Sequence, residues 1–235
     1  MRRFARFVLG RRKRPPEPPG RPKLVIFDFD GTIADTFDAG VVILNKLAAE
    51  FGFRALHPKD LERVREMRTR QLMKFLDIPA RKMSRIARRG SEELHACIHS
   101  IQPLPGMPEA LRELQALGFS LGIITSNTEL NVQIFLRGHD LELFEFVRCS
   151  SKLLGKARMI RSVIRRQHVR AADILFVGDE TRDIEAAKKA GIRIAAVTWG
   201  YNTRRSLEAM KPDFVFNSPG ELVALLAGRF PVQST

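Results

Sequence analysis

After Pro103 the chain alternates short apolar runs with helix-forming segments, and this alternation most constrains its fold. The apolar runs are of strand length, and several of the helical segments between them end at a glycine. Strands that alternate with helices form βαβ units, so the pattern predicts a doubly wound α/β fold, a parallel sheet with helices on both faces. The predicted strands span residues 23–27, 120–124, 144–148, 173–177, 193–197 and 213–216, and the predicted helices span residues 107–117, 129–136, 156–167, 182–190 and 219–227.

A segment without strand character interrupts this pattern after the first predicted strand. Apolar residues from Phe37 to Phe51 recur on one helical face, and that helix is expected to end near Gly52. From there to Gln102 the chain is rich in arginine and helical in character. We therefore predict a small helical insert over residues 36–102, within a core formed by residues 23–35 and 103–235.

The first 22 residues form a basic, proline-rich leader. Residues 1–23 hold nine Lys and Arg against the single acid Glu17. Their net charge of +8 is more than half of the formal net charge of +14 of the chain. The prolines between Pro15 and Pro22 cannot extend a helix. We predict that residues 1–22 are disordered. Contact of residues 2–14 with nucleic acid or an anionic membrane is the less favoured alternative.

The cysteine content and the apolar runs bear on location. Cys97 and Cys149 lack metal-ligand spacing and are too few for a disulfide framework, which favours a reducing, cytoplasmic setting. No apolar run approaches the ~20 residues that a membrane span needs. Arg3 and Arg6 interrupt the apolar part of the leader and no small-residue cleavage pattern follows, so a secretory signal is poorly supported.

Chemically capable side chains follow the predicted strands. Asp28 and Asp30 come after the first strand, Thr125-Ser126 after the second, and Asp179 and Asp183 after Val177-Gly178, while Lys156 opens a predicted helix. In a parallel sheet the ligand site lies beyond the carboxyl ends of the strands. These side chains are therefore expected to converge at one edge of the sheet.

Several acids at one sheet edge would repel one another without a cation. Ligands that are all oxygen suit Mg²⁺, and because no His or Cys accompanies the cluster, zinc is disfavoured. Lys156 supplies a compact positive charge for a phosphate oxygen, and a threonine hydroxyl with free backbone N–H groups makes a phosphate cradle. Together these are the parts that phosphoryl transfer requires.

Each of these residues also has a plain structural interpretation. Asp30 is able to serve as a turn residue before Gly31, Asp183 as a first-turn helix acid, Thr125 as a strand-end hydroxyl, and Lys156 as a surface lysine. Their occurrence together in one series favours the chemical interpretation.

Four segments in order carry a resemblance to a known family. Residues 25–32 (VIFDFDGT) resemble the first motif of the haloacid dehalogenase-like hydrolases, residues 123–126 (IITS) the second, Lys156 the third, and residues 177–183 (VGDETRD) the fourth. Residues 105–108 (PGMP) and 186–191 (AAKKAG) are similar to the phosphoglycolate phosphatase-like members. The resemblance implies a Rossmann-like core with an inserted helical cap that closes over the site, hinged near residues 35–37 and 102–104.

The same resemblance implies roles for the residues. Asp28 would attack phosphorus and form an aspartyl-phosphate, and Asp30 would serve as general acid and then general base. Thr125 and Lys156 would bind the transferring phosphoryl group, with Ser126 and Gly31 beside them. Magnesium would be held by Asp28, the backbone carbonyl of Asp30, and Asp179, with Asp183 as a ligand or as the partner of one. Glu180 stands where a small residue is often found, which leaves the division among Asp179, Glu180 and Asp183 open.

The expected reaction is hydrolysis of a small phosphorylated metabolite, with 2-phosphoglycolate the favoured single substrate. Asp30 supports this class, because the dehalogenating members of the family lack an acid at its position. The alternatives are a sugar-phosphate mutase of the same superfamily and a non-enzymatic binding protein that acts through the basic leader. No oligomeric state follows from the sequence.

Three further groups have two interpretations each. His95 and His99 have a spacing that could bind metal, but a solvated helix face is favoured because no third ligand accompanies them. Residues 199–201 (WGY) are expected either at the pocket rim or in packing. Basic residues of the insert could meet an anionic substrate, although a charged helix exterior is favoured; they are Arg65, Arg68, Arg70 and Lys74.

Overall fold

The computed structural model describes residues 20–150 and 155–228. Most of the predicted leader, including the proposed contact region 2–14, lies outside the described residues. Among the described residues, no helix is both long and apolar enough to cross a membrane.

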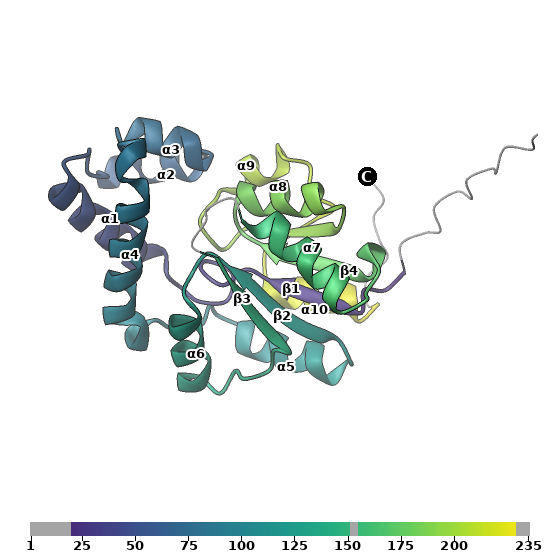
Figure 1. The fold of residues 1–235 in the computed structure, drawn as a ribbon. Helices are drawn as coiled ribbons and strands as arrows, with labels where there is room; N and C mark the ends of the chain where they lie inside the picture. The colour runs from purple at the N-terminus through teal and green to yellow at the C-terminus, as the bar shows by residue number, and fades with distance from the viewer. Residues whose placement is uncertain (1–19, 151–154, 229–235) are drawn as a thin grey trace, which may run out of the picture.

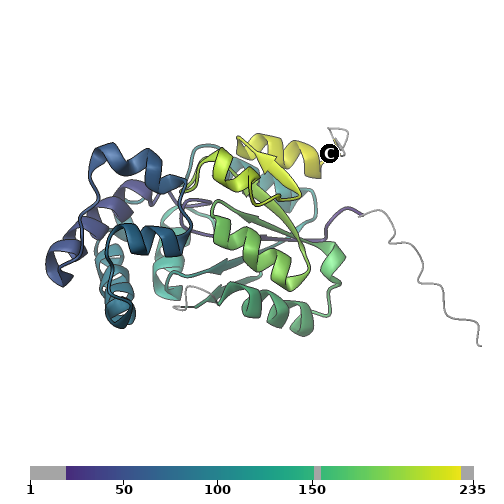
Figure 2. The same cartoon turned by 90° about the horizontal axis from the view of Figure 1, so that it is seen from above.

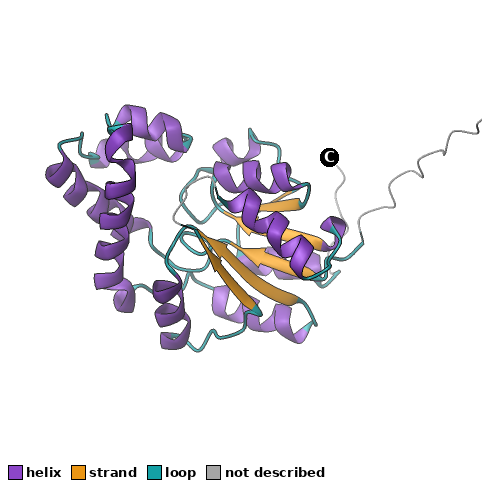
Figure 3. Ribbon diagram, in the orientation of Figure 1, coloured by secondary structure: helices purple, strands orange, loops and turns teal. Residues whose placement is uncertain are grey.

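Six parallel strands form a single sheet in the order β3-β2-β1-β4-β5-β6. Figure 3 shows the strands running between layers of helices. The strands are β1 (Leu24–Phe27), β2 (Ser120–Thr125), β3 (Phe146–Cys149), β4 (Ile174–Gly178), β5 (Arg193–Val197) and β6 (Phe214–Phe216). The first strand lies at the centre, so the residues that follow it point to the middle of one sheet edge (Figure 1).

Strand β1 shows why the sheet is covered on both faces. All four of its residues are buried. Val25 and Phe27 belong to one apolar cluster, together with residues of α5 (Met107–Ala116), α6 (Glu129–Gly138) and α10 (Pro219–Leu226). Leu24 and Ile26 belong to the other, together with residues of α7 (Lys156–Arg166), α8 (Thr181–Ala190) and α9 (Arg204–Glu208). Because successive strand side chains point to opposite faces, a fully apolar strand needs both layers, and the doubly wound α/β fold is confirmed.

The insert contains helices α1 (Phe37–Phe51), α2 (Leu61–Arg65), α3 (Thr69–Phe75) and α4 (Met83–Cys97) and, as predicted, no strand. It has an apolar cluster of its own, in which Leu47, Phe51 and Leu76 are buried. In Figure 2 these helices lie at one end of the sheet-bearing part. The two connecting segments run side by side: Ala34 pairs with Pro103, and the Asp35 amide donates to the Gln102 carbonyl at 2.9 Å. The predicted hinge segments are thus neighbours in space, and the exact domain limits stay a prediction.

One helix was not expected, and the bounds of several other elements shift by one or two residues, as in β3. Helix α9 was not predicted, because its charged sequence has no apolar periodicity; the Thr203 hydroxyl caps it and the single buried residue Leu207 anchors it. Strand β3 begins at Phe146 rather than at residue 144, since pairing with β2 starts opposite Gly122. A Cβ at Gly122 would overlap the Phe146 ring, so the register depends on this glycine.

Candidate active site

The predicted site residues meet beyond the carboxyl ends of β1, β2 and β4. Asp28 follows β1, and its amide continues the ladder by donating to the Val177 carbonyl at 2.8 Å. Thr125 ends β2, and Asp179 follows β4. All three side chains are buried. Parallel strands carry these side chains to the same edge because their carboxyl ends coincide.

Lys156 lies between two of the acids. It opens α7 and is 3% exposed, and its Nζ forms ion pairs with Asp28 and, at 2.5 Å, with Asp183. Burial alone would lower the pKa of Lys156, but Asp183 and Asp28 together raise it above its ordinary value. The lysine is therefore a fixed positive charge, and the interpretation of it as a surface lysine is wrong.

The carboxylates form a group suited to a divalent cation. One oxygen each of Asp28, Asp179 and Asp183 lies within 4.8 Å of the others. Burial and the Asp183 charge raise the pKa of Asp28 to about 7, against the lowering by Lys156. Burial, with Glu180, Asp28 and Asp183, also raises the pKa of Asp179. Asp28 Oδ2 pairs with Lys156 but has no properly oriented hydrogen bond. Buried acids that are costly to ionise, with an oxygen still to be satisfied, fit the oxygen-ligated cation expected for this site.

Asp179 is held by residues from two distant segments. Thr32 Oγ1 donates to one of its oxygens and the Tyr201 amide to the other, both at 2.7 Å. A Cβ at Gly31 or at Gly200 would overlap Asp179 Oδ2. Gly31 has a φ of +74°, which suits glycine. The role of Tyr201 and Gly200 in fixing Asp179 was not predicted, although the 199–201 segment had been singled out.

Asp30 lies apart from this group of three and is held by Asn127. The Asn127 Nδ2 donates to both carboxylate oxygens, at 3.1 and 3.2 Å. Burial raises the pKa of Asp30, while Arg182 and Lys156 oppose the shift. Asn127 was not predicted as a site residue; its place directly after Thr125-Ser126 was the available signal.

Thr125 and Ser126 directly precede Asn127, which holds Asp30. Thr125 Oγ1 accepts from the Asn127 amide at 3.0 Å, and Ser126 Oγ accepts from Arg182 at 3.3 Å. Arg182 also donates to Glu180 Oε1 at 2.5 Å, and this half-buried pair was not foreseen from the sequence. Glu180 is thus the partner of Arg182 and lies outside the group of three carboxylates, although its amide donates to Asp183 Oδ2 at 3.1 Å.

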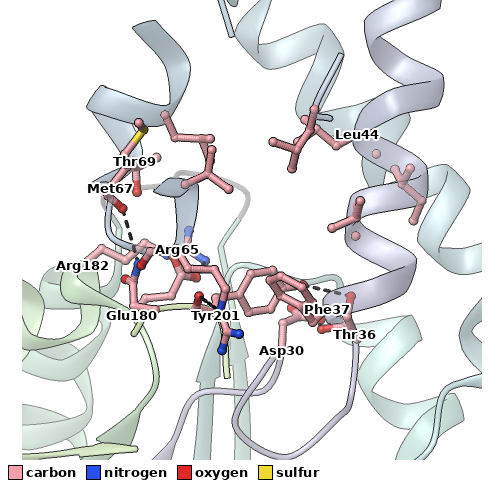
Figure 4. A pocket seen from close by; sticks show the side chains of 18 of the residues that line it. Asp30, Thr36, Phe37, Leu44, Arg65, Met67, Thr69, Glu180, Arg182 and Tyr201 are labelled. Carbon is pink, nitrogen blue, oxygen red and sulfur yellow. Dashed lines mark hydrogen bonds and ion pairs between the residues drawn. The ribbon is translucent and has the colours of Figure 1, made fainter. Parts of the chain in front are cut away.

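A cavity of about 360 Å³ lies between the insert and the sheet edge. Figure 4 shows Asp30, Arg182 and Tyr201 on its sheet side and Phe37 and Leu44 on the insert side. A second cavity of about 620 Å³ also reaches Asp30 and is lined by residues of α4 and of the loop after β2. Asp30 therefore borders both of these cavities.

The remaining candidates lie as follows. Tyr201 lines the first cavity and its hydroxyl donates to the Thr36 carbonyl at 3.0 Å, whereas Trp199 packs against the core. Both interpretations of this segment therefore hold in part.

Arg65 is half-buried and donates to the carbonyls of Gly200 and Tyr201 at 2.9 and 3.1 Å. Arg68, Arg70 and Lys74 are exposed, as favoured. His95 and His99 are exposed too, and neither lies in the carboxylate group.

Comparison with known proteins agrees with the family resemblance of the four sequence motifs. The profile of the haloacid dehalogenase-like hydrolases matches residues 25–197. A phosphoglycolate phosphatase of Synechococcus elongatus is 34% identical over 200 residues, which is 85% of this chain and 94% of the relative. A phosphoglycolate phosphatase of Vibrio parahaemolyticus is 27% identical over 222 residues, covering 87% and 96%.

Solved structures share the fold at lower identity. A haloacid dehalogenase-like hydrolase from Streptococcus pneumoniae superimposes with a TM-score of 0.74 at 21% identity, covering 87% of this chain and 98% of the other. CbbY from Rhodobacter sphaeroides, solved in complex with phosphate, gives a TM-score of 0.67 at 22% identity, covering 86% and 96%.

Proposed function

The chain belongs to the haloacid dehalogenase-like hydrolase family, among the phosphoglycolate phosphatase-like phosphatases, and from this premise we propose that it hydrolyses a small phosphomonoester through an aspartyl-phosphate on Asp28. The observation that carries the proposal is the ion pair of buried Lys156 with Asp28, two residues before Asp30, which lines the cavity. Lys156 favours the ionised, nucleophilic form of Asp28.

In the first step an Asp28 oxygen attacks phosphorus and the ester P–O bond breaks. Asp30 gives its proton to the departing alkoxide, so the alcohol leaves neutral. The raised pKa of Asp30 favours the protonated form that this step needs. Lys156 and the Thr125 and Ser126 hydroxyls bind the phosphoryl oxygens, and the Lys156 charge neutralises theirs. Gly31 lies in the same loop as Asp30, and its own amide donates to the Ala34 carbonyl at 2.9 Å.

In the second step Asp30, now a carboxylate, takes a proton from water while the water oxygen attacks phosphorus. The bond from phosphorus to Asp28 breaks, which releases inorganic phosphate and restores both acids. Asn127 keeps the Asp30 carboxylate in one orientation through both steps.

Asp28, Asp179, Asp183 and the backbone carbonyl of Asp30 would hold the magnesium ion, which would neutralise negative charge on the phosphoryl oxygens when bound. The proximity of Asp28, Asp179 and Asp183 supports this ligand set. Because Glu180 forms an ion pair with Arg182, Asp179 and Asp183 are favoured over Glu180 as ligands.

The proposed substrate is 2-phosphoglycolate, on the strength of the relatives that carry that name and match this chain over most of their length. Residues 36–102 are proposed to act as the cap, because they wall the cavity opposite Asp30. Such a cap would exclude bulk water and so protect the aspartyl-phosphate until Asp30 activates the water that attacks phosphorus. A cytoplasmic setting remains part of the proposal.

The test is release of phosphate from a panel of phosphomonoesters that includes 2-phosphoglycolate and a sugar phosphate. With Mg²⁺ the wild type should release phosphate, and Asp28→Asn should lower kcat by about 10³-fold or more, as expected when a nucleophile is removed. Removal of Mg²⁺ with EDTA should abolish turnover.

Asp77→Asn is a matched control, because Asp77 is exposed in the insert and its φ of +54° suits asparagine equally well. It should retain wild-type activity. Equal rates in wild type and Asp28→Asn would refute the mechanism. Isomerisation of the sugar phosphate without release of phosphate would identify the mutase alternative instead.

A further inference from the structure

A chain of hydrogen bonds runs from the insert to Asp30. His95, on α4, lies with its Nδ1 2.8 Å from Asn131 Oδ1 on α6. Asn131 Nδ2 donates to Asn127 Oδ1 at 3.0 Å. Asn127 Nδ2 then donates to both oxygens of Asp30, at 3.1 and 3.2 Å. Three side chains from three segments are thus connected in series to one carboxylate.

A backbone amide fixes the direction of every bond in this chain. The Thr128 amide donates to Asn127 Oδ1 at 2.7 Å, so that atom is an acceptor and Nδ2 must face Asp30. The group that Asn131 presents to Asn127 Oδ1 must then be its NH₂, which leaves Asn131 Oδ1 facing His95. His95 Nδ1 must therefore carry a hydrogen and donate it.

Burial makes this arrangement hard to replace. Asn131 is fully buried and Asn127 is 6% exposed. A buried amide that loses one partner has no water with which to replace it, so it reorients or leaves a polar group unsatisfied. His95 is itself exposed, and it is the point at which the buried series meets the insert.

We propose that His95 is a positioning residue for Asp30, which it orients through Asn131 and Asn127. The proposal rests on the proposed function, in which Asp30 transfers the proton. The proposed effect is a limit on side-chain rotation. The hydrogen bond from Asn131 holds the Asn127 amide in place, and this amide fixes the plane of the Asp30 carboxylate. Without His95, Asn131 Oδ1 loses its donor and the Asn131 amide is free to turn. Asn127 Oδ1 then keeps the Thr128 amide but loses the second donor, so the Asn127 amide holds Asp30 less firmly.

The first test compares His95→Leu, which removes the donor, with His95→Asn, whose side-chain NH₂ can reach the position of Nδ1. On the best substrate of the panel, His95→Leu should lower kcat about five-fold, as for loss of one hydrogen bond at the reacting geometry, with KM within about two-fold of wild type. His95→Asn should restore most of the loss.

His99→Leu is the matched control, since His99 is exposed and its side chain makes no hydrogen bond within the described part of the chain. It should leave kcat unchanged. Unchanged kcat in His95→Leu, or an equal loss in His95→Asn and His95→Leu, would overturn the proposal.

A second test asks whether His95 acts through Asn131. In an Asn131→Ala background, His95→Leu should cause no further loss of kcat, because the series is already broken; multiplied losses would show independent action and overturn the proposal. The side-chain amide resonances of Asn127 should shift in His95→Leu and stay in place in His99→Leu, and unshifted resonances would also overturn it.

Failure of the two proposals is distinguishable. If Asp30→Asn retained full turnover, the proposed acid/base role would fail, whatever the His95 variants did. If Asp30→Asn were inactive while His95→Leu matched wild type in both kcat and the Asn127 resonances, the positioning proposal alone would fail.

Discussion

At the scale of single residues, the surroundings of Asp179 show that the site requires glycine at two positions. Gly31 approaches it from the loop after β1, and Gly200 from the loop after β5. Gly31 belongs to an Asp-Gly sequence that already predicts a turn, so its importance was visible. Gly200 carries no such signal, because its constraint comes from a carboxylate about twenty residues earlier in the chain.

Gly200→Ala should therefore impair the site. The new Cβ would overlap Asp179 Oδ2 and the Gly31 carbonyl, and a backbone atom cannot move aside as a flexible side chain can. We expect kcat/KM to fall at least about ten-fold and more Mg²⁺ to be needed for half-maximal activity. Steady-state assays over a magnesium titration measure both.

The control for this variant is Gly220→Ala, because a Cβ at Gly220 meets a single atom at ordinary contact distance, Ser218 Oγ at 3.9 Å. Its activity should equal that of wild type. Wild-type activity and magnesium dependence in Gly200→Ala would contradict the steric account.

Helix α2 shows at the scale of elements how the insert is attached. Arg65, at its end, donates to the carbonyls of Gly200 and Tyr201, and its own carbonyl accepts from Asn202 Nδ2 at 2.7 Å. The guanidinium also lies over the Phe37 ring. Periodicity predicted that the insert is helical, but it could not show that one of its arginines binds the loop that fixes Asp179.

Arg65→Ala should loosen this contact without removing any reacting group. We expect kcat/KM to fall about five-fold, mainly through KM, because the cavity wall formed by α2 is less well placed. Arg81→Ala is the control, since Arg81 is an exposed arginine of the same insert. Equal kinetics for the two variants would show that the Arg65 contacts do not position the wall.

The whole molecule responds to pH through its buried acids. Asp28, Asp30 and Asp179 all have raised pKa values, and that of Asp28 rises from 3.8 to about 7. Between these two values the metal-free folded chain holds a proton on Asp28 that the unfolded chain has released. The stability contributed by that proton is complete below the unfolded pKa and is lost as pH rises through the folded one.

The free energy of unfolding of metal-free protein should therefore decrease between about pH 4 and about pH 7 more steeply in wild type than in Asp28→Asn, which cannot titrate at this position. The magnesium ion proposed for this site would bind the ionised carboxylates, so it should restore stability most at the higher pH. Urea unfolding with EDTA or with Mg²⁺ measures both effects. An equal pH slope in wild type and Asp28→Asn would contradict the assignment.

The sequence by itself determined the α/β class, the helical character of the segment inserted after the first strand, and the convergence of Asp28, Thr125 and Asp179. These are local consequences: alternating burial defines strands and helices, and parallel strands bring their carboxyl ends to one edge. Only the tertiary structure decided that Lys156 lies between Asp28 and Asp183, that Gly200 and Tyr201 enclose Asp179, that Arg182 pairs with Glu180, and that His95 reaches Asp30 through two asparagines. The physical reason is that such contacts join segments far apart in the chain, where distance and direction depend on the packing of whole helices and carry no periodic signal.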